Sequence, residues 1–257
     1  MITLTSDWID DDYYVAALKG RISSHCPDVR ITDISHRIKA WNIAQAAYLV
    51  RNAFLHFPEG SIHIVAVDSE PAPGKHLLAA RLKGHFFLCA DNGFLGLLGK
   101  VEPESVVALK VPEGKHESTF VSLDIFAGAA CSLAQGTSLE DLGEEEKEYE
   151  KQVPMRPVFQ DNVITGSILH IDSYGNAHTN ISREFFENTG AGRSFSIYVQ
   201  SKYNVIERIN SKYRESRMGD LLAIFNSAGL LEIAICNGNA AELLHLSPKS
   251  TVRIDFN

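Results

Sequence analysis

The sequence predicts an N-terminal α/β domain with a central, mostly parallel sheet, followed by a smaller C-terminal antiparallel β-barrel domain. Up to about residue 135, short apolar segments alternate with stretches of helical periodicity, a pattern typical of a parallel sheet covered by helices. Beyond residue 163 the chain consists of strand-like segments separated by turn residues, which indicates a mainly β domain. We therefore expect domains over 1–152 and 164–257, with a linker over 153–163.

The elements of the first domain follow from local patterns. Five short, largely apolar segments are expected to form strands: 2–7, 29–35, 61–68, 77–82 and 85–91. Three segments with apolar residues at helical spacing are expected to form helices: 13–24, 42–55 and 126–136. Polar residues follow the first three strands, at 6–12, 33–36 and 68–75. Because ligands bind beyond the carboxyl ends of strands in open α/β sheets, a site is expected there.

The second domain begins after an acidic stretch. Residues 139–157 combine many glutamates with two prolines, which is typical of a solvated helix end that passes into a linker. Four later segments are expected to contain the strands: 164–181, 193–200, 220–235 and 250–256. The polar turns at 172–180, 226–229 and 237–241 are either ordinary hairpin connections or, taken together, a place to hold an amino acid or the edge of a purine.

Composition excludes several classes of protein. The formal net charge is −8 and the Lys and Arg residues are scattered, so a nucleic-acid surface is not expected. The sequence shows neither an apolar membrane span nor a secretory signal, so we expect a cytoplasmic protein. Cys26, Cys89, Cys131 and Cys236 are far apart in apolar or helical contexts, so buried free thiols are expected rather than disulfides. The histidines form no zinc-binding motif, so no structural zinc site is expected, and a metal is possible only through carboxylates. We expect neither a metal nor a cofactor.

The segment 6–14 carries the densest charge. Four aspartates lie within six residues where a strand passes into a helix: Asp7, Asp10, Asp11 and Asp12. Carboxylates this close repel one another unless a cation or hydroxyl groups lie nearby. One interpretation is that one of the last three caps the helix. The others are a divalent cation site and a site for ribose hydroxyls and an ammonium group, and the pattern itself does not choose among the three.

Two further segments carry candidate chemistry. Asp68 ends a strand and enters a loop rich in Pro and Gly, which places a carboxylate at the sheet edge under a rigid loop. The alternative is that Asp68 only bonds turn amides. The segment 118–124 leads into a helix of small residues, and we expect Ser122 or Asp124 to cap that helix.

Seven segments, in chain order, resemble the family that contains the S-adenosylmethionine (SAM) hydrolases, or SAM hydroxide adenosyltransferases, and the related fluorinase and chlorinase. They are LTSDWIDDDYYVAALKG, DISHRIKAWNIAQAAYLV, HFPEGSIHIVAVD, CADNGFLG, STF with DIFAGAA, IDSYGNAHTNI and NSAGLLEIAICNGNAAELL. The resemblance covers nearly the whole chain. It implies an N-terminal α/β domain, a C-terminal β-barrel, and a homotrimer whose SAM sites lie between the N-terminal domain of one subunit and the C-terminal domain of its neighbour.

The resemblance also implies roles for individual residues around the amino-acid part of the substrate and the ribose. Asp7 would bind the ribose hydroxyls, and Asp12 and Asp172 would bind the ammonium group of the methionine moiety. Tyr14 and Ser227 would lie near its carboxylate. Anionic side chains suit a substrate that carries both a sulfonium and an ammonium group.

For the nucleoside, the resemblance implies contacts from both ends of the chain. Asn176 and the backbone around Asn237 would contact the adenine edge, while Tyr213 and Trp41 would pack on the nucleoside. Four further residues complete the expected substrate contacts: Thr119, Phe120, His178 and Asn226.

The implied reaction is attack of water on C5′ of the ribose, with methionine as the leaving group. A sulfonium leaves without a proton, so the enzyme has to align the water and remove its proton. In the family's hydrolases this falls to an Asp, an Arg and a His. Here Asp68 is kept, Lys75 stands in place of the Arg, and Val121 stands in place of the His. We expect Asp68 to deprotonate the water and Lys75 to steady Asp68.

Two neighbouring residues are candidates for the altered catalytic set. His76 is the nearest substitute imidazole, although an exposed loop histidine is the simpler interpretation. Ser122 supplies a hydroxyl of the kind that a halide pocket needs. Asp68, however, would put a negative charge where the halide has to sit, so halide transfer is not expected.

The sequence therefore predicts a SAM hydrolase that forms adenosine and L-methionine without a cofactor and with an altered catalytic set. The alternative from a different class is a homologue that binds SAM or adenosine without turnover, which the replaced Arg and His positions favour. A metal-dependent nucleoside hydrolase is a third hypothesis. It is based on the acidic segment 7–12, which lacks the glycine of that family's acidic loop.

Overall fold

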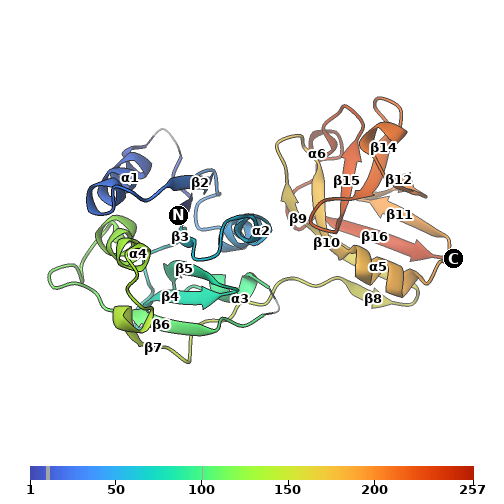
Figure 1. Ribbon diagram of the computed structural model, residues 1–257. Helices are drawn as coiled ribbons and strands as arrows, with labels where there is room; N and C mark the ends of the chain where they lie inside the picture. The colour runs from blue at the N-terminus through green and yellow to red at the C-terminus, as the bar shows by residue number, and fades with distance from the viewer. Residues whose placement is uncertain (10–11, 100) are drawn as a thin grey trace. The chain divides into compact units, whose positions relative to one another are not determined.

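The computed structural model describes residues 1–9, 12–99 and 101–257, and the chain forms two compact units, Met1–Pro154 and Met155–Asn257 (Figure 1). The first unit contains a seven-stranded sheet with helices, and the second a nine-stranded, nearly closed barrel. The predicted fold class is confirmed. Among the described residues, no helix combines the length and the apolar character needed to cross a membrane.

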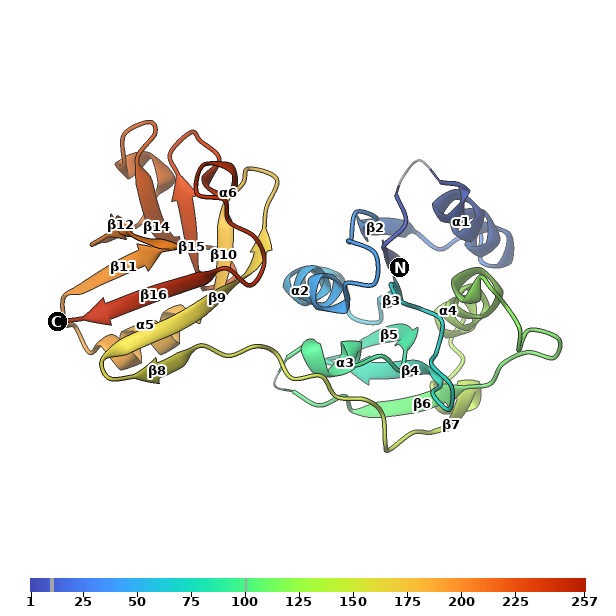
Figure 2. The same ribbon diagram turned by 180° about the vertical axis from the view of Figure 1, so that it is seen from behind.

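The sheet of the first unit has the strand order β2, β1, β3, β5, β4, β6, β7 (Figure 2). The strands are β1 (Ile2–Ser6), β2 (Ile31–Ser35), β3 (Ile62–Ala66), β4 (Leu77–Leu82), β5 (His85–Ala90), β6 (Ser105–Leu109) and β7 (Gly143–Glu145). Neighbours pair in parallel from β2 to β5 and antiparallel from β5 to β7. All strands except β4 and β7 therefore run in one direction, so the sheet is mostly parallel in strand direction.

The antiparallel part of the sheet begins at a two-residue hairpin. Lys83 and Gly84 connect β4 to β5 with φ values of 50° and 75°, which is the turn geometry that matches the right-handed twist of paired strands. A two-residue connection joins only antiparallel neighbours. This turn therefore sets β4 against β5, while β5 keeps its parallel pairing with β3.

Helices cover both faces of this sheet. On one face α1 (Tyr13–His25) and α4 (Ala127–Ala134) share a core that includes Ile22 and Phe126. On the other face α2 (Ile43–Ala53) and α3 (Phe94–Leu97) pack around Phe87. Three short turns of helix complete the unit: η1 (Phe54–His56), η2 (Ser122–Phe126) and η3 (Glu140–Leu142). The expected helices at 13–24, 42–55 and 126–136 are thus present with small shifts at their ends.

A disulfide joins the two helices of the first face. Cys26 at the end of α1 is bonded to Cys131 in α4, with their Cα atoms 5.7 Å apart. The expectation of free thiols is wrong for this pair, because the packing of α1 on α4 brings together two residues that are 105 positions apart. Cys89 and Cys236 are buried free thiols, as expected.

The acidic stretch after α4 also differs from expectation. Instead of a solvated helix end, η3 leads into β7, which pairs antiparallel with β6. Gly143 permits this pairing, because a Cβ at that position would overlap the backbone of Ala108. Glutamates then occupy an edge strand, where charge discourages further pairing.

The second unit is a barrel with the strand order β12, β11, β16, β9, β10, β15, β14, β13. Its strands are β8 (Val158–Gln160), β9 (Val163–Ile171), β10 (Ala177–Ser182), β11 (Phe195–Val199), β12 (Ser201–Ile206), β13 (Ile209–Asn210), β14 (Leu221–Phe225), β15 (Leu230–Ile235) and β16 (Thr251–Phe256). β8 pairs with β9 outside this path, and β12 contacts β14, which nearly closes the barrel. Three short helices lie in the connections: α5 (Arg183–Gly190), η4 (Tyr213–Glu215) and α6 (Ala240–Leu243).

Loss of the disulfide is expected to destabilise the first unit. The bond closes a loop of about a hundred residues, so its removal should lower the free energy of unfolding by about 2 to 5 kcal/mol. The measurement is urea unfolding of the oxidised and reduced protein, with the Cys26→Ala/Cys131→Ala double variant as the control on which reductant has no effect. Alkylation of all four cysteines in denaturant without reductant would show that the bond does not form.

Candidate functional site

The polar segments after β1 and β3 meet at one edge of the first unit's sheet. β1 and β3 pair in parallel with Ser6 opposite Ala66, so Asp7 and Asp68 follow neighbouring strand ends. A pocket of about 330 Å³ opens at this edge. The residues that line it are Asp7, Trp8, Tyr14, Ala40, Trp41, Ser69, Glu70, Thr119, Phe120 and Val121. Five residues predicted to contact substrate are therefore brought together: Asp7, Tyr14, Trp41, Thr119 and Phe120.

Three aromatic rings form one wall of this pocket. The ring of Phe120 meets the rings of Trp8 and Tyr14 edge to face, with centroid separations of 5.2 Å in both pairs. Trp8 and Tyr14 are themselves 5.7 Å apart. Such arrangements stabilise a cluster by about 0.5 to 1.5 kcal/mol per pair beyond the area they bury. The pocket thus has a fixed aromatic wall beside its carboxylates.

Asp7 is anchored by the backbone. Its Oδ2 accepts a hydrogen bond of 2.9 Å from the backbone N of Trp41, which itself has a φ of 60° and a side chain that is 75% exposed. This bond ties the segment before α2 to the end of β1. It occupies one carboxylate oxygen of Asp7 and orients the other, which suits an acceptor for a ligand hydroxyl.

Asp68, which follows β3, has a raised pKa. It has a φ of 46°, and the amide of Asn92 donates a 2.9 Å hydrogen bond to its backbone oxygen. Burial raises the pKa of the Asp68 carboxyl, and the charges of Asp7 and Glu70 raise it further. A carboxylate with a raised pKa is a better proton acceptor than an ordinary one near neutral pH.

Lys75 and His76 do not support Asp68 in this structure. The ammonium of Lys75 lies 3.3 Å from Asp91 Oδ2 and 3.7 Å from Glu150 Oε2, and within the described ranges it forms no ion pair with Asp68. Two other carboxylates thus attract this cation in the ligand-free structure, and the role of Lys75 beside Asp68 stays a prediction. The imidazole of His76 is 3.9 Å from Glu146 and mostly exposed, which is the environment of an ordinary loop histidine.

Ser122 is buried next to the pocket-lining Val121. Its hydroxyl is fully buried and has no hydrogen-bond partner among the described residues, and it begins a short π-helical turn, a feature often found at functional sites. The expectation that Ser122 or Asp124 caps the following helix is wrong. The carboxylate of Asp124 instead accepts hydrogen bonds of 2.7 Å from Lys115 and 2.8 Å from Ser118.

Asp12 is exposed at the start of α1. It occupies the N-cap position, but its side chain makes no capping hydrogen bond. Its carboxylate still lies at the positive end of the helix dipole. The two other candidates for capping, Asp10 and Asp11, lie outside the described residues.

In the second unit, the turn between β9 and β10 is organised by Asp172. Its Oδ1 accepts 2.9 Å hydrogen bonds from the backbone N atoms of Tyr174 and Asn176, and the Asn176 amide donates to Oδ2 at 3.3 Å. Gly175 has a φ of 80° and packs against Asn239, whose side chain a Cβ would overlap. The hydrogen bond to Oδ2 turns the Asn176 amide toward Asp172.

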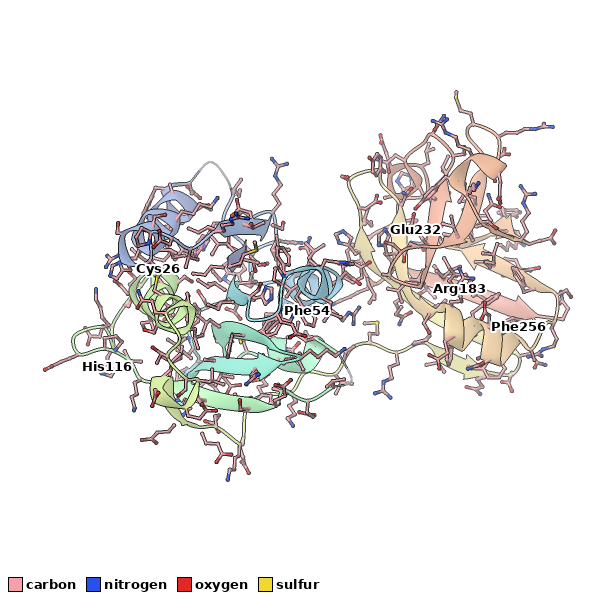
Figure 3. All side chains as sticks on the ribbon, viewed as in Figure 1. Cys26, Phe54, His116, Arg183, Glu232 and Phe256 are labelled. Atoms are coloured by element: carbon pink, nitrogen blue, oxygen red, sulfur yellow. A yellow bond between two sulfur atoms is a disulfide. The ribbon has the colours of Figure 1, made fainter. Side chains whose placement is uncertain are left out.

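A buried carboxylate joins the predicted residues of the second unit. Glu232 lies on β15 (Figure 3), and it is only 1% exposed. Its Oε1 accepts a 2.7 Å hydrogen bond from the Tyr213 hydroxyl, and its Oε2 accepts a 3.1 Å bond from the Asn226 amide. His178 Nε2 lies 3.2 Å from Glu232 Oε2 and 3.6 Å from Asp172 Oδ2. We call these five residues the Glu232 cluster.

The Glu232 cluster contains four residues that the sequence predicted and one that it did not. Burial raises the pKa of the Tyr213 hydroxyl, and its hydrogen bond to Glu232 raises it further, so Tyr213 remains a donor. Glu232 was missed because it lies in an apolar strand segment, LLEIAI. A single charge at a buried strand position was the available signal, since such a charge requires partners.

The two remaining predicted contacts lie on loops of the second unit. Ser227 is exposed in the turn between β14 and β15, next to Asn226. Asn237 is exposed after β15 with a φ of 52°. Their roles stay predictions.

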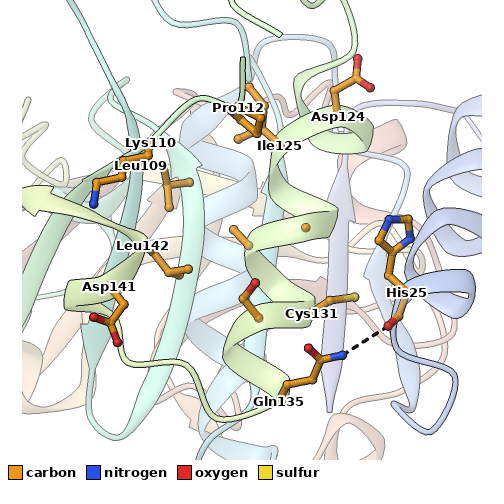
Figure 4. Close-up of a pocket in the computed structure, with 13 residues that line it drawn as sticks. His25, Leu109, Lys110, Pro112, Asp124, Ile125, Cys131, Gln135, Asp141 and Leu142 are labelled. Carbon is orange, nitrogen blue, oxygen red and sulfur yellow. Dashed lines mark hydrogen bonds between the residues drawn. The ribbon is translucent and has the colours of Figure 1, made fainter. Parts of the chain in front are cut away.

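A larger pocket lies beside α4 (Figure 4). It has a volume of about 450 Å³, and residues such as Lys110, Cys131 and Asp141 line it. At its edge the Gln135 amide donates a 3.3 Å hydrogen bond to the backbone oxygen of His25. Since the described lining includes none of the predicted site residues, size alone does not locate the candidate site.

Two family models match the chain, one over each unit. Residues 2–143 match the SAM hydroxide adenosyltransferase N-terminal domain, and residues 166–253 match the SAM hydroxide adenosyltransferase C-terminal domain. The fold and the paired matches define a two-domain protein of this class. The chain belongs to the SAM hydroxide adenosyltransferase family, so the resemblance seen in the sequence is confirmed.

Relatives of known name match over nearly the full length. The (R)-S-adenosyl-L-methionine hydrolase of Methanocaldococcus jannaschii is 29% identical, over 100% of this chain and 96% of its own. The fluorinase of Actinopolyspora mzabensis is 25% identical, over 99% and 96%. Among solved structures, an uncharacterised conserved protein from Thermotoga maritima has a TM-score of 0.90 at 26% identity, over 99% of this chain and 100% of its own.

Replacement of Asp68 by Asn is expected to stabilise the fold at neutral pH. Because the pKa of Asp68 is raised by burial and by Asp7 and Glu70, the native state holds its proton more tightly than the unfolded state does. Ionised Asp68 therefore costs stability as the pH rises above the ordinary carboxyl range. The gain should be below about 1 kcal/mol at pH 7, since the side chain is partly solvated.

The test is the free energy of unfolding of Asp68→Asn at pH 7 and in acid. The gain should disappear in acid, where Asp68 of the parent chain is protonated. Asp28→Asn, an exchange at an exposed carboxylate, is the matched control. A loss of stability at pH 7, or an equal gain at both pH values, would contradict the electrostatic assignment.

Proposed function

We propose that this chain binds SAM and hydrolyses it to adenosine and L-methionine by attack of water at C5′ of the ribose. The observation that carries the proposal is the placement of Asp7 and Asp68 after neighbouring strand ends, at the edge where a pocket lined by Asp7 and by aromatic rings opens. Relatives named (R)-S-adenosyl-L-methionine hydrolase support the same reaction. SAM carries a sulfonium group, and the carboxylates of Asp7 and Asp68 attract its positive charge.

In the proposed mechanism, binding supplies most of the alignment. Asp7 accepts hydrogen bonds from the ribose hydroxyls, and the rings of Trp8, Tyr14 and Phe120 flank the substrate. The oxygen of the water molecule bonds to C5′ while Asp68 accepts a proton from that water. The bond between C5′ and sulfur breaks at the same time and releases methionine, whose sulfur is then a neutral thioether. No proton is needed by the leaving group, so one base is sufficient.

The basicity of Asp68 has a source other than Lys75. Burial together with the charges of Asp7 and Glu70 raises its pKa, whereas a neighbouring Arg or Lys would lower it. Ser122 is a candidate for positioning the water, since its buried hydroxyl has no partner among the described residues. No metal is assigned to this reaction, so a chelator should not lower the rate.

We also propose a cytoplasmic homotrimer with composite sites. The predicted substrate contacts are divided between the two units, with the aromatic pocket in one and the Glu232 cluster in the other. Neither unit holds the complete set. Light scattering of the purified protein gives the subunit number directly.

The rate of adenosine release is expected to depend on Asp68. Asp68→Asn should lower it by about 10²- to 10⁴-fold, the usual contribution of a general base, while SAM binding persists. Chromatography of adenosine and methionine measures the rate, and Asp28→Asn is the matched control. An unchanged rate in Asp68→Asn would contradict the assigned base.

The pH dependence of the rate tests the same residue without removing it. The rate should rise with pH as Asp68 loses its proton and level off above its raised pKa. Glu70→Gln removes one of the charges that raise this pKa, so its profile should shift to lower pH. A shift to higher pH would contradict the role of Glu70.

A binder without turnover is the second candidate function. It is favoured by the apolar, buried Val121 at the expected His position and by the engagement of Lys75 with Asp91 and Glu150. It predicts saturable SAM binding with no adenosine above the uncatalysed rate, so the same chromatography separates the two functions.

A further inference from the structure

Three side chains of the second unit converge like the ligands of a metal ion. One ligand atom each of Asp172, His178 and Glu232 lies within 4.8 Å of the other two. They come from the end of β9, from β10 and from β15, strands that are neighbours in the barrel. The barrel's hydrogen-bonding register therefore fixes their separation.

The distances fit a small transition-metal ion. Zinc binds imidazole nitrogen and carboxylate oxygen at about 2.0 to 2.2 Å, so two ligands of a tetrahedral ion lie about 3.3 to 3.6 Å apart. His178 Nε2 is 3.2 Å from Glu232 Oε2 and 3.6 Å from Asp172 Oδ2. The set combines one nitrogen and two oxygen donors and leaves a fourth position for water or another ligand.

The charge of the three ligands also favours a cation. Two carboxylates face one imidazole, and in the described ranges neither carboxylate has a Lys or Arg ion-pair partner. Glu232 is almost fully buried, where an ionised group needs a nearby positive charge. A divalent ion at this point would balance both carboxylates.

Neighbouring residues hold the ligands in place. The Tyr213 hydroxyl bonds Glu232 Oε1, and the Asn226 amide bonds Oε2. Two backbone N–H groups bond Asp172 Oδ1, and the Asn176 amide bonds Oδ2. Metal-binding carboxylates are typically oriented by such hydrogen bonds, and removal of the residues that donate them weakens metal binding by about 10- to 100-fold.

We propose that Asp172, His178 and Glu232 bind one divalent transition-metal ion of the zinc class, and that this ion competes with the ammonium group of SAM. The metal is an inhibitor here and has no part in the reaction. The competition rests on the proposed function, because it assumes that Asp172 receives the substrate's ammonium. The metal site itself does not.

Metal binding is tested on the untagged full-length protein with Zn²⁺ and a competing chromophoric chelator. The parent chain should bind one Zn²⁺ tightly, and His178→Asn and Glu232→Gln should each weaken binding by more than about 10-fold. His245→Asn is the matched control, since His245 is exposed with a φ of 52° that Asn tolerates. Equal binding by His178→Asn and the parent chain would overturn the site.

A spectroscopic measurement avoids dependence on the variants' folding. Co²⁺ added to the parent chain should give the intense visible absorption of a tetrahedral nitrogen and oxygen site, and Zn²⁺ should abolish it. The weak spectrum of hydrated Co²⁺ would overturn the proposal.

The competition is tested by the Kd of SAM at increasing Zn²⁺. The apparent Kd should rise in proportion to Zn²⁺ above saturation in the parent chain and in His245→Asn. A Kd that does not change while Zn²⁺ is bound would overturn the competition. If Zn²⁺ binds but SAM binds neither with nor without it, the proposed function fails and the metal site stands.

Discussion

The parallel pairing of β1 with β3 is the constraint on which the candidate site depends. It places two carboxylates, Asp7 and Asp68, after neighbouring strand ends. Burial raises the pKa of Asp68, and the charge of Asp7 raises it further. The same edge receives the aromatic wall formed by Trp8, Tyr14 and Phe120. The carboxylates of Asp7 and Asp68 repel each other in the free protein, which costs stability. Both attract the positive charge of the sulfonium in the proposed substrate.

Most of the fold was predictable because local patterns agree with the tertiary structure. The short apolar segments form strands as predicted, and the polar segments after β1 and β3 lie at the candidate site. Sequence patterns did not reveal which cysteines or which strands pair when the two partners are far apart in the chain and tertiary packing brings them together. The bond between Cys26 and Cys131 depends on how α1 packs on α4, and β7 joins the sheet because Gly143 allows a close approach to β6.

The candidate site was predictable to a similar extent, and for similar reasons. Asp7 and Tyr14 share a pocket because Asp7 directly follows β1 and Tyr14 lies in the first turn of α1, the next element. The partner of Lys75 was not predictable, since Asp91 and Glu150 come from other segments that compete for its charge. Glu232 was missed because its role exists only once three barrel strands place His178 and Asp172 beside it.

The most direct test of water attack at C5′ is hydrolysis of SAM in water enriched in ¹⁸O, with mass spectrometry of both products. Attack by water that Asp68 deprotonates forms the new oxygen–carbon bond at C5′. Adenosine should therefore carry one ¹⁸O in its 5′-hydroxyl, and methionine should carry none. Unlabelled adenosine, label in methionine, or no adenosine at all would contradict this mechanism.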